Sequence, residues 1–163
     1  MEVWRLEIAT VQEIIFMNKQ NIPWNDVEKY LKKYIGRTFI VSKYNDMIHI
    51  GGDFPDEYTE SRYTKKLRGS LAKSKANAAQ VIGEMIKIAD NKRWMENKEN
   101  KHRKDASRGW YRYDTRFSIP VKENGSGEKR QNIFRATIIV RSTDQGLYLY
   151  DVINIKKEAS TPL

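Results

Sequence analysis

The last third of the chain places cationic and hydroxyl side chains at alternate positions of the segments 110–121, 132–142 and 147–155. Alternate residues of a β-strand point to the same face of a sheet. If these segments pair, one face collects Arg112, Asp114, Arg116, Ser118, Arg135, Thr137, Arg141, Tyr148, Tyr150, Asn154 and Lys156. Guanidinium groups bind phosphates through paired hydrogen bonds, and aromatic rings stack on bases. The pattern indicates a surface suited to RNA, although such alternation is more often that of an ordinary solvated sheet face.

One of the two histidines lies in a strongly basic segment. His102 is surrounded by Lys101, Arg103 and Lys104. An imidazole that titrates near neutral pH can act as a general acid or base, so His102 is a candidate catalytic residue. A solvated loop side chain is the alternative interpretation. His49 lies in the apolar run 47–50 and is expected to be a structural or surface residue of a strand.

These groups match the needs of RNA cleavage without a metal ion. That reaction requires a base for the 2′-hydroxyl, an acid for the leaving 5′-oxygen and cations around the charged phosphorane. As a hypothesis, His102 acts as base or acid and Tyr148 positions or protonates the leaving group. Arg116 and Arg135 neutralise the phosphate, and Thr137 forms a hydrogen bond with it. The expected product is a 2′,3′-cyclic phosphate.

Other chemistries find little support in the sequence. The chain has no cysteine, which excludes disulfides, thiolate metal ligands and a cysteine nucleophile. No His, Asp and Glu residues cluster at the spacing of metal ligands, so no metal is expected. Gly51, Gly52 and Gly83 lie outside any dinucleotide or phosphate-loop fingerprint, so no cofactor is expected.

Composition favours a polyanionic partner. Thirty Lys and Arg against 21 Asp and Glu give a formal net charge of +9, and the pI is near 9.6. This balance favours nucleic acid, with RNA first and an anionic membrane as the weaker option, although positive charge can also serve solubility alone. No run approaches the roughly 18 consecutive apolar residues of a membrane span. The first residues suit neither a secretory signal nor a transit peptide, so we expect a cytoplasmic protein without a membrane partner.

The 163 residues suit one α+β domain with a single core. An amphipathic helix is predicted to begin at Asn25, which can cap it, and to stop at Gly36. The runs 38–42 and 47–50 predict a hairpin, followed by a loop at Pro55.

The main packing helix is predicted from Ser70 to Asp90, followed by a basic link over 91–108. The first twenty residues suggest a strand at 4–8 and a short helix at 11–16. The expected architecture is thus a mainly helical part with a short hairpin over 1–108, an antiparallel meander over 109–157 and a tail over 158–163. The helices should pack on one face of the meander.

Period-two alternation also predicts which side chains of the meander meet the helices. The expected core residues are Tyr111, Tyr113, Phe117, Ile119, Val121, Phe134, Ala136, Ile138, Val140, Leu147, Leu149, Ile153 and Ile155. The helix should contribute Leu71, Ala78, Ile82, Met85, Ile86 and Ala89.

Two blocks of residues also carry a resemblance to a known family. The first contains Asp56-Glu57-Tyr58-Thr59, Tyr63-Thr64-Lys65-Lys66-Leu67-Arg68-Gly69 and Lys75-Ala76-Asn77-Ala78-Ala79-Gln80. The second contains Lys101-His102 with Asp105, Gly109-Trp110-Tyr111-Arg112-Tyr113, Arg116-Phe117 and the ending 148–158 before Ser160-Thr161-Pro162-Leu163. From about residue 37 onward, the chain resembles a domain of large polyvalent proteins of phages and conjugative elements.

Such domains are similar to the barnase, EndoU, colicin E5/D and RelE (BECR) nuclease group, in which helices precede an antiparallel sheet whose exposed face cuts RNA. The resemblance implies a ribonuclease-like domain of the toxin or mobile-element effector type, acting on tRNA or mRNA, with an immunity or antitoxin protein as a further partner. It implies the catalytic residues His102, Arg116, Arg135, Thr137 and Tyr148. The expected RNA-binding residues are Lys101, Arg103, Lys104, Arg112, Arg141, Tyr150, Lys156, Ser160 and Thr161. The alternative is a module that binds nucleic acid or protein without cutting.

Overall fold

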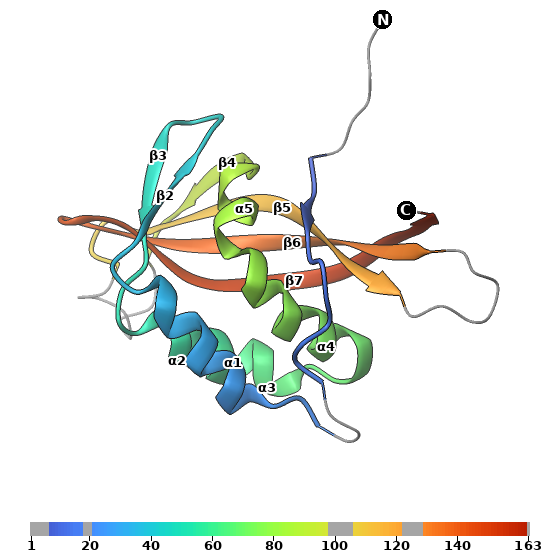
Figure 1. Ribbon diagram of the computed structural model, residues 1–163. Helices are drawn as coiled ribbons and strands as arrows, with labels where there is room; N and C mark the ends of the chain where they lie inside the picture. The colour runs from blue at the N-terminus through green and yellow to red at the C-terminus, as the bar shows by residue number, and fades with distance from the viewer. Residues whose placement is uncertain (1–6, 18–20, 98–105, 122–128, 163) are drawn as a thin grey trace, which may run out of the picture.

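Three long antiparallel strands form the centre of the fold. The structure is a computed structural model that describes residues 7–17, 21–97, 106–121 and 129–162. Within these ranges β5 (Trp110–Val121), β6 (Arg130–Thr143) and β7 (Gly146–Pro162) pair in sequence order (Figure 1). The predicted meander is confirmed, and β7 continues to Pro162 through most of the residues that were expected to form a tail.

Four shorter strands extend this sheet on both sides. β1 (Ala9–Thr10) runs parallel to β5, and β4 (Asp90–Met95) pairs with the same strand antiparallel. β3 (Asp46–His49) runs parallel to the start of β7 and forms the predicted hairpin with β2 (Thr38–Val41). The order among the described residues is β1-β5-β6-β7-β3-β2, with β4 also beside β5. The expected basic link over 91–108 is therefore wrong in its first part, which is strand β4.

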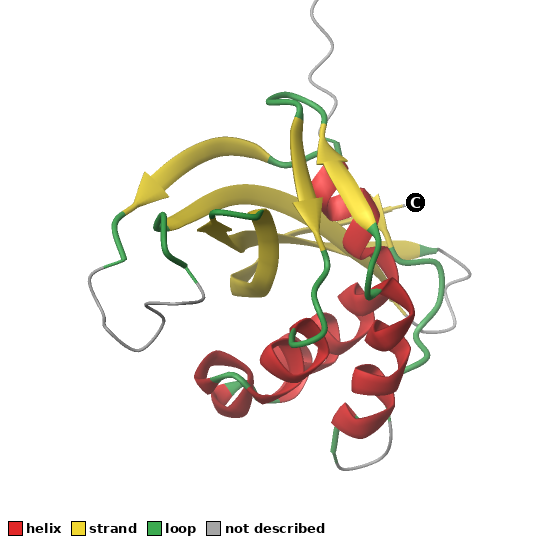
Figure 2. Ribbon diagram, turned by 90° about the vertical axis from the view of Figure 1, so that its left-hand side faces the viewer, coloured by secondary structure: helices red, strands yellow, loops and turns green. Residues whose placement is uncertain are grey.

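The helices gather on one side of the curled sheet (Figure 2). They are α1 (Trp24–Leu31), α2 (Phe54–Glu60), α3 (Arg62–Lys66), α4 (Gly69–Ala78) and α5 (Ile82–Lys87), with 3-10 turns at Lys32–Tyr34 and Ala79–Val81. α5 packs against β2 and β5, whereas α4 packs against β5 and β7. The α+β class is confirmed, and the helix predicted over 70–90 is present as α4 and α5 with a tighter turn between them. In the part of the chain that the structure describes, no helix has both the length and the apolar character to cross a bilayer.

Prolines start two of the helices. α1 begins at Trp24 after Pro23, and the Asn25 side chain does not cap it, so the predicted cap is wrong. The loop predicted at Pro55 is also wrong, because Pro55 lies in the first turn of α2. Proline suits this position since its fixed φ is helical and the first turn needs no backbone donor. Gly36 has φ +86° after Tyr34, as predicted for the residue that stops the first helix.

The core lies between the helices and the inner face of the meander. Phe117 and Phe134 face each other across β5 and β6, with stacked rings 5.3 Å apart. The Thr115 hydroxyl donates to the Met85 carbonyl at 2.8 Å and ties β5 to α5. Most of the predicted core positions of β5 and β6 are buried, as are the predicted helix positions from Ala78 to Ala89. Full burial of one such aromatic side chain contributes about 1.5–3 kcal/mol.

The segment after β1 is extended, so the helix predicted over 11–16 is wrong. Its apolar side chains Val11 and Phe16 are buried, but its backbone is held by a side chain of α4. Asn77 Oδ1 accepts hydrogen bonds from the amides of Ile15 (2.9 Å) and Phe16 (3.1 Å), and its Nδ2 donates to the Phe16 carbonyl. These contacts satisfy the backbone groups that a helix would otherwise pair internally.

β7 does not follow simple alternation. Its core residues Leu149, Val152 and Ile155 recur at every third position. The pairing with β6 shifts by one residue at three points, close to Tyr150, Asn154 and Glu158, which makes each a β-bulge. A bulge inserts one unpaired residue and moves the following side chains to the other face. The prediction of Ile153 as a core residue is therefore wrong, because Val152 takes that place.

Candidate nucleic-acid interface

Three cationic side chains lie side by side on the face of the sheet that points away from the core. The register pairs Arg116 of β5 with Arg135 of β6, and Arg135 with Lys156 of β7. Their chain neighbours Phe117 and Phe134 are buried on the opposite face. We call Arg116, Arg135 and Lys156 the cation row.

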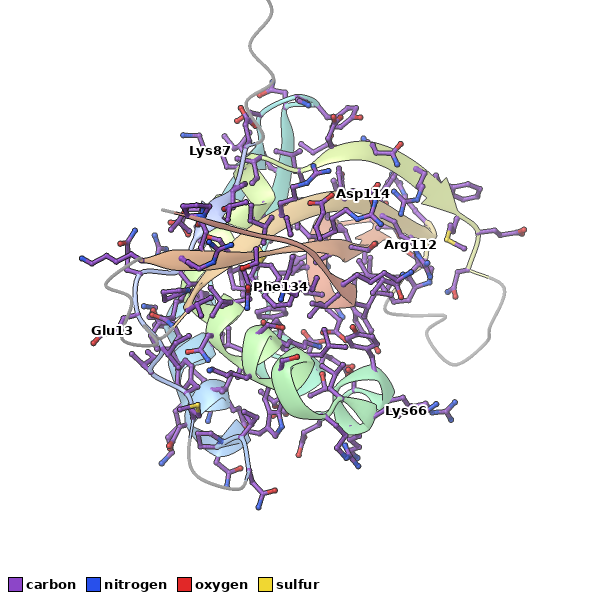
Figure 3. All side chains as sticks on the ribbon, turned by 90° about the vertical axis from the view of Figure 1, so that its right-hand side faces the viewer. Glu13, Lys66, Lys87, Arg112, Asp114 and Phe134 are labelled. Atoms are coloured by element: carbon purple, nitrogen blue, oxygen red, sulfur yellow. The ribbon has the colours of Figure 1, made fainter. Side chains whose placement is uncertain are left out.

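The same outer face carries other polar side chains of β5. Arg112 and Asp114 lie on it, whereas Phe134 points to the helices (Figure 3). Arg112 and Lys156 form no ion pair with any residue that the structure describes. These two cations are thus free to bind an external anion.

Glu158, which the sequence interpretation did not include, meets two members of the cation row. Arg116 donates from Nε to Glu158 Oε1 at 2.8 Å and from a terminal nitrogen to Oε2 at 3.2 Å. Arg135 Nε lies 3.7 Å from the same carboxylate. The hydrogen bond from Arg116 lowers the pKa of Glu158, and Glu158 raises the pKa of Arg116 in return. Glu158 therefore holds the two guanidinium groups close to each other.

A pocket with a volume of about 880 Å³ opens beside the cation row. It lies along the edge of β5 between β4, which pairs as far as Asp114, and β1, which pairs from Phe117. Its lining includes the whole cation row and the predicted residue Thr137, together with Glu7, Lys43, Ile88, Asp90, Asn91, Asp114, Thr115, Ala136 and Asn154. Four of the residues predicted to handle RNA are thus brought to one site.

The carboxylates of this pocket are largely neutralised by neighbours. Lys43 binds Asp90 at 2.5 Å, which lowers the pKa of Asp90 and raises that of Lys43. Asp114 accepts from Arg93 at 3.0 Å and from Asn91 at 2.7 Å. Within the cation row, Lys156 has no ion-pair partner among the described residues and Arg135 has one only at 3.7 Å, whereas Arg116 is paired with Glu158.

Tyr148 lies away from the cation row. It is the register partner of Arg141 on β6, and Arg141 is six positions along that strand from Arg135. At about 3.3 Å per residue this separates them by about 20 Å. Arg141 stacks over the Tyr148 ring at 5.1 Å and binds Asp53 through both terminal nitrogens, at 2.7 and 3.2 Å.

The other residues predicted to bind or cleave RNA lie at other positions of β7 or outside the described residues. Tyr150 packs edge-on against Trp110 at 5.0 Å, near Arg141. Ser160 and Thr161 lie at the far end of β7, opposite Asn132 and Gln131. Lys101, His102, Arg103 and Lys104 are outside the described residues. The structure thus divides the predicted site into a cationic end and an aromatic end.

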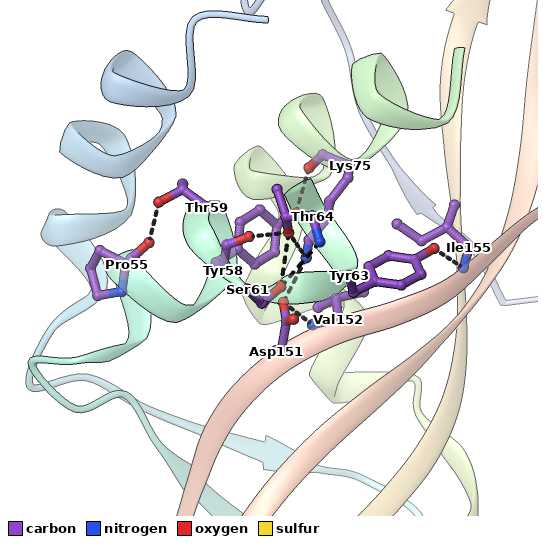
Figure 4. A network of polar contacts seen from close by, with 10 residues as sticks. All are labelled: Pro55, Tyr58, Thr59, Ser61, Tyr63, Thr64, Lys75, Asp151, Val152 and Ile155. Carbon is purple, nitrogen blue, oxygen red and sulfur yellow. Dashed lines mark hydrogen bonds and ion pairs between the residues drawn. The ribbon is translucent and has the colours of Figure 1, made fainter. Parts of the chain in front are cut away.

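A second polar cluster is sealed inside the protein. Lys75 of α4 donates to Asp151 of β7 at 2.7 Å and to Thr64 Oγ1 at 2.5 Å, and Thr64 in turn donates to the Tyr58 carbonyl (Figure 4). The Tyr58 hydroxyl donates to the Lys75 carbonyl. The network is inaccessible to a macromolecule, so its role is to join the helices to β7.

Residues that the sequence interpretation missed or discounted include His49, Asp53 and Glu158. Counting residues could have found Glu158, because it stands two positions after Lys156. Asp53 and His49 become visible only once β3 is paired with β7. In the described ranges, no group of three or more His, Cys, Asp or Glu residues is arranged to hold a metal ion.

Comparison of the chain with protein-family models, with curated proteins and with solved structures finds no match.

Proposed function

We propose that this protein is a metal-independent ribonuclease-like domain that holds RNA on the outer face of β5, β6 and β7. The observation that carries the proposal is the cation row, in which Arg116, Arg135 and Lys156 are register neighbours on three strands and line one pocket. Arginine binds phosphate through paired hydrogen bonds, and lysine adds a mobile point charge. A row across three strands suits a phosphate backbone better than a single small anion.

Cations without a close ion-pair partner support the same proposal of RNA binding. Lys156 and Arg112 have no ion-pair partner among the described residues, and Arg135 has one only at 3.7 Å. Cations held in place without a close partner gain most when a phosphate displaces their counterions. The excess of 30 basic over 21 acidic residues adds long-range attraction for RNA.

The order of elements supports a nuclease-type fold. The described residues that resemble the polyvalent-protein domain fall mainly on α2, α3 and α4 and on the strands β5 and β7. The helices α2 to α5 precede the antiparallel strands β5 to β7, which is also the order in the barnase, EndoU, colicin E5/D and RelE group, while β1, β2 and β3 come earlier in this chain. The proposal therefore includes a variant of that arrangement, in a cytoplasmic protein of a phage or mobile element with an inhibitor protein as partner.

Binding is tested with matched charge variants. One protein carries Arg116→Ala, Arg135→Ala and Lys156→Ala, and the control carries Lys29→Ala, Lys32→Ala and Lys66→Ala, which remove the same charge from the helices. Fluorescence anisotropy with a labelled, uncleavable 2′-O-methyl RNA is measured across a salt series. For three phosphate contacts on a single strand, the first variant should lower the slope of log K against log salt by about 2. Equal slopes for both variants would contradict the assignment of the interface.

Cleavage is tested by incubating the protein with total tRNA in EDTA. The expected result is fragments ending in 2′,3′-cyclic phosphate, lost in the His102→Ala variant if that residue is the acid or base predicted from the sequence.

A second function is favoured by one observation. Among the described residues that line the pocket there is no histidine, and Arg116 holds the nearby Glu158 in its ionised form. A site of that kind binds phosphate without transferring protons, as expected of a non-catalytic RNA-binding module. Salt-sensitive retention of intact tRNA in the same assay would select this function. A protein that neither cleaves nor retains tRNA would instead point to a protein partner.

A further inference from the structure

A row of chemically different side chains crosses the aromatic end of the same outer face. The register pairs His49 of β3 with Tyr148 of β7, and Tyr148 with Arg141 of β6. The rings of His49 and Tyr148 are 5.3 Å apart, and the Arg141 guanidinium is 5.1 Å from the Tyr148 ring. Imidazole, phenol and guanidinium thus lie next to one another on three neighbouring strands. We call His49, Tyr148 and Arg141 the acid–base row.

His49 Nε2 and the Tyr148 hydroxyl make no hydrogen bond with the described residues. His49 Nδ1 is 2.7 Å from Thr38 Oγ1. When Nδ1–H donates to that hydroxyl, Nε2 carries a lone pair and can accept a proton. The Tyr148 hydroxyl donates to no other residue in the described ranges.

Two neighbours hold the third member of the row. Asp53 binds Arg141 through both carboxylate oxygens and fixes the plane of the guanidinium. Gly51 lets these groups approach, because a Cβ there would come within 3.2 Å of Asp53, 3.4 Å of Arg141 and 3.5 Å of Tyr148. The terminal nitrogens of Arg141 keep further protons for a phosphate oxygen.

From this arrangement we infer that the acid–base row, and not the cation row, performs the cleavage of RNA held on the outer face. The inference rests on the proposed function, and it assigns His49 as general base, Tyr148 as general acid and Arg141 as the group that binds the phosphate oxygens. The 2′-hydroxyl gives its proton to His49 Nε2, and the 2′-oxygen forms a bond to phosphorus. The bond from phosphorus to the 5′-oxygen breaks, and that oxygen takes the Tyr148 proton. The products are a 2′,3′-cyclic phosphate and a 5′-hydroxyl, and solvent returns the protons to their starting groups.

The distance between the two rows is consistent with RNA binding by the cation row and RNA cleavage by the acid–base row. About 20 Å along β6 separates Arg135 from Arg141, so one RNA strand can contact both rows. Trp110 lies opposite Arg141 on the neighbouring strand β5, and its ring packs edge-on against that of Tyr150. Aromatic rings of this kind can stack on bases. The cation row then contributes affinity for RNA, and the acid–base row accelerates its cleavage.

The test separates binding from cleavage. His49→Ala and Tyr148→Phe are compared with wild type and with the control Tyr30→Phe, which removes a phenol from α1 on the helical side. Cleavage of a labelled oligoribonucleotide is followed in EDTA, and affinity is measured with its uncleavable 2′-O-methyl form. Each variant should lose at least about 100-fold in cleavage rate while its affinity stays within about twofold of wild type. Added imidazole should restore part of the rate of His49→Ala and none of that of Tyr148→Phe.

The possible failures are distinguishable. Unchanged cleavage in His49→Ala, or cleavage lost only in His102→Ala, overturns the assignment while the proposed function stands. A wild-type protein that binds the RNA but does not cut it also overturns the assignment and leaves the binding module. If the wild type does not bind the uncleavable RNA, the proposed function fails together with the inference. Thermal unfolding of each variant shows whether a loss reflects chemistry or folding.

Discussion

Lys75 and Asp151 form an ion pair inside the protein, with Lys75 Nζ 2.7 Å from Asp151 Oδ1 and the two side chains 0% and 2% exposed. The pair joins α4 to the first bulge of β7. Burial lowers the pKa of Lys75 and raises that of Asp151, while the attraction between the two charges opposes both shifts. Thr64 and the Tyr58 and Tyr63 rings surround the ammonium group. The pair is therefore held by a complete set of partners, and removal of either member leaves a buried charge.

Replacement of Lys75 should destabilise the protein strongly. Lys75→Met leaves the Asp151 carboxylate without its cation, which should cost about 3–5 kcal/mol of unfolding free energy. The double variant Lys75→Met, Asp151→Leu should recover most of that loss, because no charge remains in the core. Urea unfolding of the single variants and the double variant gives the coupling energy. A loss below about 1 kcal/mol in Lys75→Met would show that the pair contributes little.

The stability of the Lys75→Met variant should increase as the pH falls. Since burial raises the pKa of Asp151, the folded state binds a proton more tightly than the unfolded state does. Without Lys75 to oppose this effect, Lys75→Met should gain stability as the pH falls from 7 toward 4.5. Unfolding curves at several pH values test the sign, and a variant that loses stability over this range would contradict it.

Removal of the Asn77 side chain should release the segment after β1. Asn77→Ala leaves the amides of Ile15 and Phe16 and the Phe16 carbonyl without their partner, at a cost of about 2–4 kcal/mol. Hydrogen exchange should accelerate at Ile15 and Phe16 before it does so in β6. Gln80→Ala is the comparison, because Gln80 donates to the exposed Glu13 carbonyl at 2.9 Å and to Asn77 Oδ1 only at 3.3 Å, so its removal should cost below about 1 kcal/mol. Equal effects of the two substitutions would disprove the special role of Asn77.

The bulge at Asn154 should prefer glycine. Asn154 has φ +53°, a conformation that β-branched residues avoid. Asn154→Gly should leave stability unchanged or raise it, whereas Asn154→Val should lower it by about 1–2 kcal/mol. The comparison is made by thermal unfolding, with Asn132→Val on the neighbouring β6 as control for the change of side chain. A stable Asn154→Val protein would mean that the backbone of the bulge can move to a conformation that valine tolerates.

Glu158 should stabilise the fold above acidic pH and weaken RNA binding. Its pKa is lowered in the folded protein, so its contribution is present above its unfolded pKa of about 4.3 and is lost as the pH falls through the folded value. Glu158→Gln should therefore be less stable than wild type by about 1 kcal/mol at pH 7, and by less near pH 3.

In RNA binding the same substitution should act in the opposite direction. Glu158→Gln removes an anion that competes with phosphate for Arg116, so affinity for 2′-O-methyl RNA should rise by roughly threefold to tenfold. Anisotropy at low salt measures the change. Weaker binding would instead mean that Glu158 is needed to position the guanidinium groups.

The sequence predicts the elements whose side-chain pattern is set by burial. It fails where contacts with a distant part of the chain determine the local backbone structure. β5 and β6 alternate along most of their length, so the sequence pattern predicts the faces of most of their residues, although Ser118 and Thr137, expected on the outer face, are buried. β4 was missed because it carries the charged residues Asp90, Lys92 and Arg93 and has no apolar alternation. The segment 11–16 has a helical pattern of apolar residues, but the side chain of Asn77 replaces the hydrogen bonds of a helix.

The candidate site was predictable to a similar degree. Arg116 and Arg135 meet because alternation places them on one face and the antiparallel pairing of β5 with β6 places them opposite each other. The separation of Tyr148 from them also follows from the turn at 143–146, since residues close to a turn pair with each other. What no pattern could give is the parallel pairing of β3 with β7, which brings His49 from a distant part of the chain.

The three bulges of β7 make the length of that strand a constraint on every residue beyond them. Deletion of one residue between Tyr148 and Glu158 would change the pairing of β7 with β6 and alter which of its side chains face the core. Chains descended from a common ancestor with this one should therefore gain and lose residues in the turns, and keep the spacing from Tyr148 to Glu158 fixed.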